Sequence, residues 1–214
     1  LKIDEAVLGP HHSNTATSLN NLAQLHQAMG NHAAALPLAT RALKIYEAVL
    51  GADHPDTATS LNNLALLHHA MGNHAAALPL YTRSLNIREA VLGPDHPETA
   101  TSLNNLASPH HAMGNHADAL PLATRALKIR EAVHGPYHPD TAGSLNNLAQ
   151  LHKDMGNHAA ALPLATRALK IIEAAFGPDH PCTRILFGNL AKLHAHMGNH
   201  PVAAPRAVCA RCGT

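Results

Sequence analysis

The chain has few aromatic residues and few charges, and each scarcity narrows the possible structures and functions. Its 214 residues include no tryptophan, two phenylalanines and three tyrosines, so little aromatic area can be buried. Lys and Arg number 15 against 14 Asp and Glu, and no run of like charges occurs. Electrostatics therefore gives no reason to expect nucleic acid or an anionic membrane as a partner.

Long apolar runs and cysteines are also scarce. No stretch approaches the roughly 18 consecutive apolar residues of a transmembrane helix, and no signal peptide is visible after Leu1. Cys182, Cys209 and Cys212 are too few for a disulfide framework, which favours a reducing, intracellular and cytoplasmic setting. Cys209 and Cys212 form one CxxC without a second pair, so no zinc site is expected there.

Repetition is what the chain has in abundance. The turn Gly-Asn-His recurs every 42 residues, at Gly30, Gly72, Gly114, Gly156 and Gly198. A second glycine recurs with the same period, at Gly9, Gly51, Gly93, Gly135 and Gly177. Two such breaks in each period predict two elements per repeat.

Both elements have the pattern of a helix. In the first, one face repeats at i, i+3, i+4 and i+7, through Leu61, Leu64, Ala65 and His68. Pro55 marks its start, with Asp56 and Thr57 expected to supply the cap or first turn, and Gly72 marks its end. The second is predicted over 74–92, with an apolar stripe of Leu78, Leu85 and Val91.

One such helix pair cannot bury both its faces, so successive pairs must stack into an α-solenoid. The segment 54–93, "HPDTATSLNNLALLHHAMGNHAAALPLYTRSLNIREAVLG", recurs nearly verbatim and resembles the tetratricopeptide repeat in the 42-residue form found in kinesin light chains. The resemblance implies an all-α, right-handed solenoid of antiparallel helix pairs. It also implies that the first helices line a concave groove.

The repeat phase predicts the organisation of the chain. Residues 1–214 are interpreted as one solenoid fragment that begins, at 1–9, inside the second helix of a truncated repeat. Four full repeats follow over 12–53, 54–95, 96–137 and 138–179, and 180–214 is a degenerate or partial fifth repeat. Pro109 replaces a leucine deep inside a first helix, so the third repeat is expected to be the weakest central one.

Paired asparagines are the main candidates for a binding site. On a helical wheel they lie roughly opposite the core, in two rows that the resemblance assigns to peptide-backbone contacts in the groove: Asn20, Asn62, Asn104 and Asn146, and Asn21, Asn63, Asn105 and Asn147. A carboxamide can donate to a peptide C=O and accept from its N–H. The variable neighbours expected to set specificity are Gln24, Leu66, Ser108, Gln150, His69 and His111. The alternative is that the amides only bridge adjacent helices.

The twenty histidines are interpreted mainly as structural. Two repeating sets stand where the resembled family usually has tyrosines that pack a helix pair together, at His26, His68, His110, His152 and His194, and at His32, His74, His116, His158 and His200. Adjacent histidines such as His68 and His69 point about 100° apart on a helix, which is poor geometry for one ion. No metal or other cofactor is therefore expected.

These patterns predict a non-enzymatic scaffold that binds an extended peptide of a partner protein in its concave groove. No phosphate loop, nucleophile elbow or HExxH motif is present. The groove lacks repeated Lys and Arg, so a clamp on a C-terminal carboxylate is not expected. The alternatives are a regulatory or sensor segment of a larger signalling ATPase or kinase, and a purely structural spacer. Exposed apolar ends of the array could also associate end to end.

Overall fold

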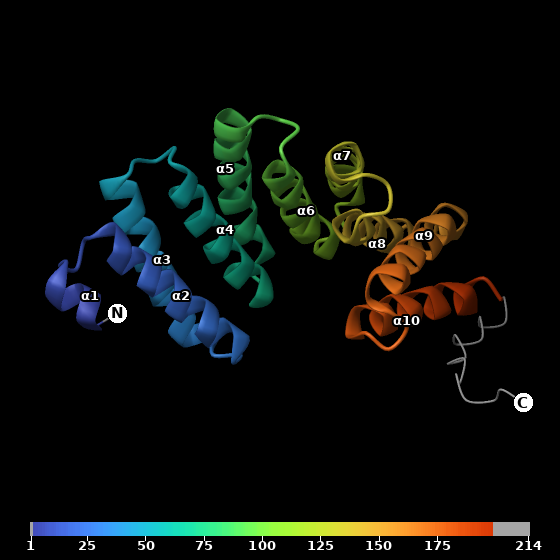
Figure 1. The fold of residues 1–214 in the computed structure, drawn as a ribbon, viewed down its shortest axis with the longest axis horizontal. Helices are drawn as coiled ribbons and strands as arrows, with labels where there is room; N and C mark the ends of the chain where they lie inside the picture. Colours follow the sequence, from blue (N-terminus) through green and yellow to red (C-terminus); the bar gives the residue numbers. More distant parts are fainter. Residues whose placement is uncertain (1, 199–214) are drawn as a thin grey trace, which may run out of the picture. The chain divides into compact units, whose positions relative to one another are not determined.

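The chain is entirely helical over residues 2–198, the part that the computed structural model describes (Figure 1). Ten α-helices occur there: α1 (Lys2–Val7), α2 (Ser13–Ala28), α3 (His32–Val49), α4 (Pro55–Ala70), α5 (His74–Leu92), α6 (Pro97–Ala112), α7 (His116–His134), α8 (Pro139–Asp154), α9 (His158–Phe176) and α10 (Pro181–His196). The chain divides into two compact units, Leu1–Leu122 and Ala123–Thr214, with the boundary inside α7, and each unit is described by itself.

Helices of the first unit pack as successive pairs. Helix α2 packs on α3, and α4 on α5, while α4 also contacts α3 and α6 contacts α5. Each first helix is thus held both by its own partner and by the second helix of the preceding repeat. The predicted all-α solenoid of helix pairs is confirmed, with α4 and α5 at the predicted positions.

The first helices begin at a histidine cap that the sequence analysis did not identify. The His54 side chain accepts a hydrogen bond through Nδ1 from the backbone N–H of Asp56, at 3.1 Å. The same cap occurs at His12, His96, His138 and His180. The cap is therefore His54, whose Nδ1 accepts from the first turn, while Asp56 and Thr57 occupy the first-turn positions that were the other role expected for them.

The Thr57 side chain links α4 to the loop that precedes it. Its side chain is fully buried, and its Oγ1 donates a hydrogen bond of 2.8 Å to the carbonyl of Gly51. Gly51 has φ +96°, a left-handed conformation that favours glycine. The same bond, at 2.7–2.9 Å, recurs at Thr15, Thr99, Thr141 and Thr183.

The core of the first unit consists mainly of leucine and alanine, with a few isoleucines and two buried tyrosines, Tyr46 and Tyr81. Leu61, Leu64 and Ala65 of α4 are buried, as the helical pattern predicted. On α5 the buried stripe contains Ala77, Tyr81, Leu85 and Ile87, and not Val91, which is half exposed. The predicted α5 stripe is therefore confirmed as buried at Leu85, while Leu78 is half-buried and Val91 is exposed.

The second unit repeats this architecture over a shorter stretch. Helix α8 packs on α9, and α9 on α10, around a cluster of Ala149, Ala161, Ala165, Leu190 and Leu193. Helix α10 is the first helix of the predicted fifth repeat. The rest of that repeat, including His200, Cys209 and Cys212, lies outside the described residues.

We expect Thr57→Val to lower the free energy of unfolding by about 1–3 kcal/mol, because the Gly51 carbonyl loses its partner. Urea denaturation followed by circular dichroism measures the change. Thr59→Val is the matched control, since Thr59 is exposed and bonds only to its own helix at Pro55. Equal stabilities of the two variants would contradict the proposed link.

We expect Pro109→Leu to raise the stability of the first unit by up to about 3 kcal/mol, because proline removes a helical N–H and crowds the preceding turn. Pro109 is buried, and the equivalent Leu67 and Leu151 are 1% and 2% exposed, so leucine fits this environment. Thermal and urea melts check the change. The reciprocal Leu67→Pro should destabilise, and a Pro109→Leu protein no more stable than wild type would refute the expectation.

Candidate peptide-binding surface

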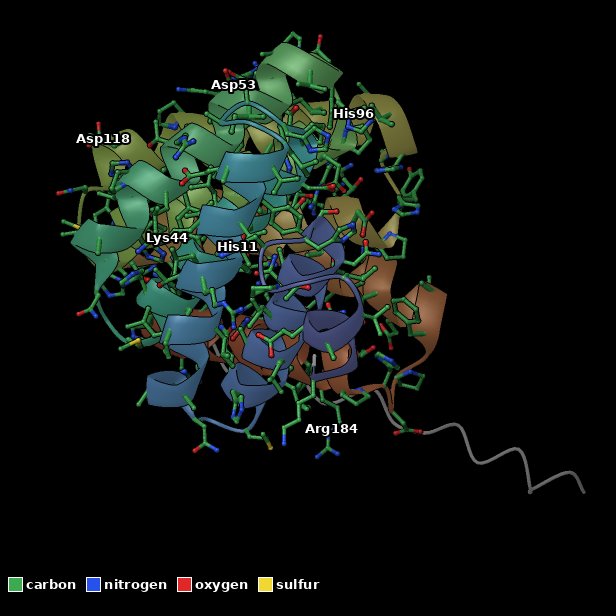
Figure 2. The ribbon with its side chains drawn as sticks, turned by 90° about the vertical axis from the view of Figure 1, so that its left-hand side faces the viewer. His11, Lys44, Asp53, His96, Asp118 and Arg184 are labelled. Atoms are coloured by element: carbon green, nitrogen blue, oxygen red, sulfur yellow. The ribbon has the colours of Figure 1, made fainter. Side chains whose placement is uncertain are left out.

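The first helices of the first unit form one continuous side of it. Helices α2 and α4 contact each other directly, as do α4 and α6, whereas α3 and α5 approach each other less closely. The row of first helices is therefore the inner, concave side of this unit. Helices α2, α4 and α6 contain no Lys or Arg, and their acidic residues, Asp56 and Glu98, lie in the first turns of α4 and α6. Charged residues labelled in Figure 2 lie elsewhere in the unit, with Lys44 on α3, Asp53 in a loop and Asp118 on α7.

The first row of asparagines is buried in this unit. Asn20, Asn62 and Asn104 are 6%, 9% and 8% exposed. The helical wheel placed them on the face opposite the core. The structure differs at Asn20 and Asn62 because the next first helix of the unit packs over each of them, so these two side chains lie between repeats. Asn146 in the second unit is half-buried.

Amide-to-amide hydrogen bonds join one repeat to the next. Asn105 Nδ2 donates to Asn62 Oδ1 at 2.9 Å in the first unit, and Asn189 Nδ2 donates to Asn146 Oδ1 at 3.2 Å in the second. Asn20 Oδ1 accepts instead from Ser60 Oγ, at 3.4 Å. The bridging role that the sequence analysis kept as an alternative is thus present at these pairs.

The second row of asparagines is more accessible. Asn21 and Asn147 are exposed, and Asn63 and Asn105 are half-buried. Asn105 uses one N–H on Asn62, which leaves its Oδ1 and second N–H for another molecule. Gln24, Leu66 and Ser108 are exposed beside this row in the first unit. In the second unit, Gln150 is half-buried and accepts from Lys153 Nζ at 2.8 Å.

His69 joins this surface to the turn between α4 and α5. Its Nδ1 lies 2.9 Å from His74 Nδ1, and its Nε2 lies 3.1 Å from Ser108 Oγ. Burial lowers the pKa of His69, and charge repulsion from His74 adds to the lowering. The equivalent His111 lies against His116, with ring centroids 5.6 Å apart. The structure thus places both predicted histidines beside the turn.

The two repeating sets of histidines contribute to packing. Their Nδ1 atoms are buried without a hydrogen-bond partner in the described residues at His26, His32, His68, His110, His116, His152, His158 and His194. Tyrosine, which the resembled family usually has at these positions, carries its polar atom at the far end of the ring. Histidine instead places one ring nitrogen within the packed contact between the helices.

Arginine contacts on the outer side were missed by the sequence analysis. Arg83 of α5 donates to Glu47 of α3 and to the backbone carbonyl of Ala52 in the following loop. Arg41 contacts Glu5 and Pro10 in the same way, and Arg167 contacts Glu131 and Pro136 in the second unit. The signal was present in the sequence, since Arg and Glu each recur with the 42-residue period.

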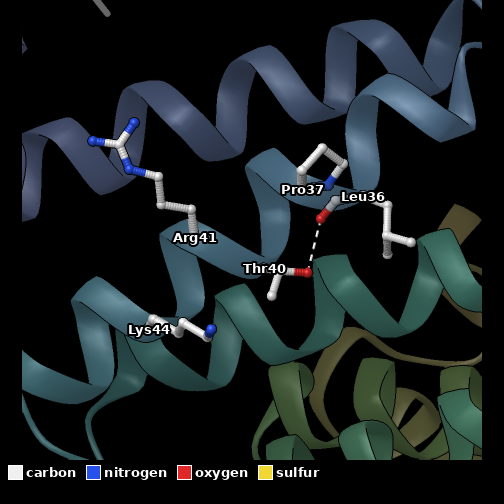
Figure 3. A pocket seen from close by; sticks show the side chains of 5 residues that line it. All are labelled: Leu36, Pro37, Thr40, Arg41 and Lys44. Atoms are coloured by element: carbon white, nitrogen blue, oxygen red, sulfur yellow. Dashed lines mark hydrogen bonds between the residues drawn. The ribbon is translucent and has the colours of Figure 1, made fainter.

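Shallow clefts lie beside two of these arginines. The cleft in Figure 3 measures about 420 Å³ and is lined by Leu36, Pro37, Thr40, Arg41 and Lys44 of α3. An equivalent cleft of about 540 Å³ is lined mainly by α9 of the second unit. In Figure 3 the Thr40 hydroxyl donates to the Leu36 carbonyl within the helix. Because the polar groups of Thr40 and Arg41 already have partners, we assign no site to this cleft.

Residues 2–198 contain neither a metal-binding cluster nor a membrane-spanning helix. No group of three or more His, Cys, Asp or Glu side chains there is arranged to hold a metal ion. No helix in that range is long and apolar enough to cross a membrane.

Stacked helix pairs of 42 residues, with inner first helices and periodic links between repeats, define a helical-repeat scaffold. A family model described as tetratricopeptide repeat matches residues 1–48, 25–90, 62–132, 110–174 and 140–210. The chain belongs to the tetratricopeptide-repeat family. Repeats of this family are in general non-enzymatic scaffolds for protein–protein interaction. A comparison with curated proteins gives no match.

Solved structures with the same fold include kinesin-light-chain-like repeats. Nearly identical TPR-like repeats of a candidate kinesin light chain from Podosopora anserina are 24% identical over 87% of this chain and 89% of that one, with a TM-score of 0.74. BtubC (BKLC) from P. vanneervenii is 22% identical over 92% and 78%, with a TM-score of 0.76. A Rap protein complexed with Competence and Sporulation Factor is 15% identical over 84% and 48%, with a TM-score of 0.71.

The lowered pKa of His69 predicts a loss of stability in acid. An unfolded histidine takes up a proton near pH 6.5, whereas folded His69 does so only at lower pH. Its contribution to the free energy of unfolding is therefore complete above about pH 6.5 and is lost as pH falls from there through the folded pKa. Urea melts at pH 7.5 and 5.5 measure this loss. His69→Gln should show a smaller loss than wild type, and an equal loss would count against the assignment to His69.

Proposed function

We propose that the inner side of the first unit binds an extended peptide segment of a partner protein, in the manner of kinesin-light-chain-like scaffolds. The observation that carries the proposal is the row of accessible amides on α2, α4 and α6, formed by Asn21, Asn63 and Asn105. They recur at one repeat position, so they present the same donor and acceptor at regular intervals. An extended peptide backbone offers a matching series of N–H and C=O groups.

The buried row supports this arrangement by restricting the accessible one. The hydrogen bond between Asn62 and Asn105 fixes the orientation of the Asn105 amide before a ligand arrives. An amide held in this way loses less conformational entropy on binding than a freely rotating one. In this proposal Asn62 and Asn104 are positioning residues, and the second row makes the contacts with the peptide.

Specificity would come from the residues that differ between repeats. Beside the amide row, α2 offers the polar Gln24, α4 the apolar Leu66 and α6 the hydroxyl of Ser108. This order favours a peptide that alternates polar and small apolar side chains. The absence of Lys and Arg on α2, α4 and α6 disfavours recognition of an anionic chain end.

The double variant Asn21→Ala/Asn63→Ala tests the contact row. We expect it to weaken binding of peptides selected from a random library on the wild-type chain by about tenfold, since each lost amide removes one or two hydrogen bonds worth about 1 kcal/mol each. Fluorescence anisotropy with labelled peptides measures the affinity. The melting temperature should stay close to that of wild type, because neither side chain hydrogen-bonds within the described part of the protein.

Asn86→Ala is the matched control, because Asn86 is an exposed asparagine on the second helix α5. It should bind the selected peptides like wild type. Asn62→Ala should instead lower stability, because it removes the acceptor for Asn105. Unchanged affinity in the double variant would refute the amide row as the binding site, and a library that yields no binder would refute peptide binding.

A further inference from the structure

Two imidazole nitrogens converge across the turn between α4 and α5. His69 lies in the last turn of α4, His74 is the first residue of α5, and both are half-buried. Their Nδ1 atoms are 2.9 Å apart, and their ring centroids are 4.7 Å apart with planes inclined at 49°. The sequence analysis weighed adjacent histidines, which diverge on one helix. The turn instead brings together residues five apart.

The separation of the two nitrogens matches a particular coordination geometry. With metal–nitrogen bonds of about 2.0–2.1 Å, nitrogens 2.9 Å apart subtend about 90° at the ion. This is the angle between neighbouring ligands in a tetragonal complex, whereas a tetrahedral ion would require about 3.3 Å. The pair therefore favours Cu²⁺ or Ni²⁺ over Zn²⁺, and Cu²⁺ is the stronger binder of the first two.

The second ring nitrogen of His69, Nε2, has a hydrogen-bond partner of the kind that metal-binding histidines commonly have. Its Nε2 lies 3.1 Å from Ser108 Oγ on α6 of the next repeat. In the tautomer with hydrogen on Nε2, this nitrogen donates to the hydroxyl and the Nδ1 lone pair faces His74. Metal-binding histidines commonly donate their second ring N–H to a protein or water oxygen, which fixes both tautomer and ring orientation.

We propose that His69 and His74 form a two-nitrogen chelate for a tetragonal divalent transition-metal ion, Cu²⁺ first, with water in the remaining coordination positions. Binding replaces the hydrogen bond between the two Nδ1 atoms by two metal–nitrogen bonds. With the His69 hydrogen on Nε2, His74 is the donor between the two Nδ1 atoms. Binding moves the His74 hydrogen from Nδ1 to Nε2, so a neutral pair releases no proton. The inference does not use the proposed contact row of asparagines, although Ser108 belongs both to this arrangement and to the proposed peptide-binding surface.

The residue pair His69 and His74 can be compared with the equivalent pairs in the other repeats. At the positions of His69 and His74, the first repeat has Gln27 and His32, and the fourth has Lys153 and His158. The third has His111 and His116, whose rings are farther apart, at 5.6 Å. Among these equivalent positions, the second repeat therefore has the closest pair of histidines. Because Gln27 stands at the equivalent position in the first repeat, His69→Gln is compatible with the fold.

Titration of the full chain with Cu²⁺ tests the proposal. Calorimetry at pH 7.5, with glycine added to keep isolated imidazoles unoccupied, should show one tight site. Electron paramagnetic resonance of the bound Cu²⁺ should show a tetragonal spectrum with two imidazole nitrogens. His69→Gln should weaken the tight site by about tenfold or more, at least the effect of losing a supporting residue around a metal.

His11→Gln is the matched control, since His11 is an exposed histidine in the loop before α2 (Figure 2). It should leave the tight site unchanged, and circular dichroism should show that both variants are folded. Equal Cu²⁺ affinities for folded His69→Gln and wild type would overturn the proposal. So would an equal loss in both variants, or a spectrum with a single nitrogen, because each indicates adventitious binding by scattered histidines.

Discussion

Every helix pair in this chain depends on its neighbours to cover it, and this constraint organises the rest of the structure. A hairpin of two helices has one face for its partner and another for the next repeat, so a single repeat cannot form a closed core. The core here is mainly leucine and alanine, with Tyr46 and Tyr81 as buried aromatic side chains. Small side chains let the helices pack closely but bury little area for each residue.

Polar contacts accordingly take a large part in joining successive repeats. The Thr57 hydroxyl fixes the loop before α4, Arg83 ties α5 to α3, and Asn105 meets Asn62 between first helices. The threonine bond is buried and directional, whereas the arginine pair is about one-third exposed on each side and contributes correspondingly little. The three contacts lie at different places on the interface, so together they restrict sliding as well as rotation between repeats.

Near-identity of the repeats separates structural positions from those that distinguish one repeat from another. A residue present in every copy, such as the capping histidine or the buried threonine, serves the stacking itself. Residues that occur in one copy give the surface its individual character. Ser108 and Leu66 occupy the same repeat position, yet one offers a hydroxyl and the other an apolar surface. In the proposed function, selectivity between peptides would arise from such differences, while the shared amides contact the peptide backbone.

The sequence by itself determined the period, the helices and their ends, because these depend on local physics. Glycines in left-handed turns and a 3.6-residue apolar pattern specify α4 and α5 almost to the residue. Tertiary structure decided which of two adjacent amides is covered, since Asn62 and Asn63 differ by only about 100° around one helix. The packing of α6 against α4, where Asn105 bonds to Asn62, settles that choice. Tertiary structure also brought His69 next to His74, across a turn, and next to Ser108, which lies in the neighbouring repeat.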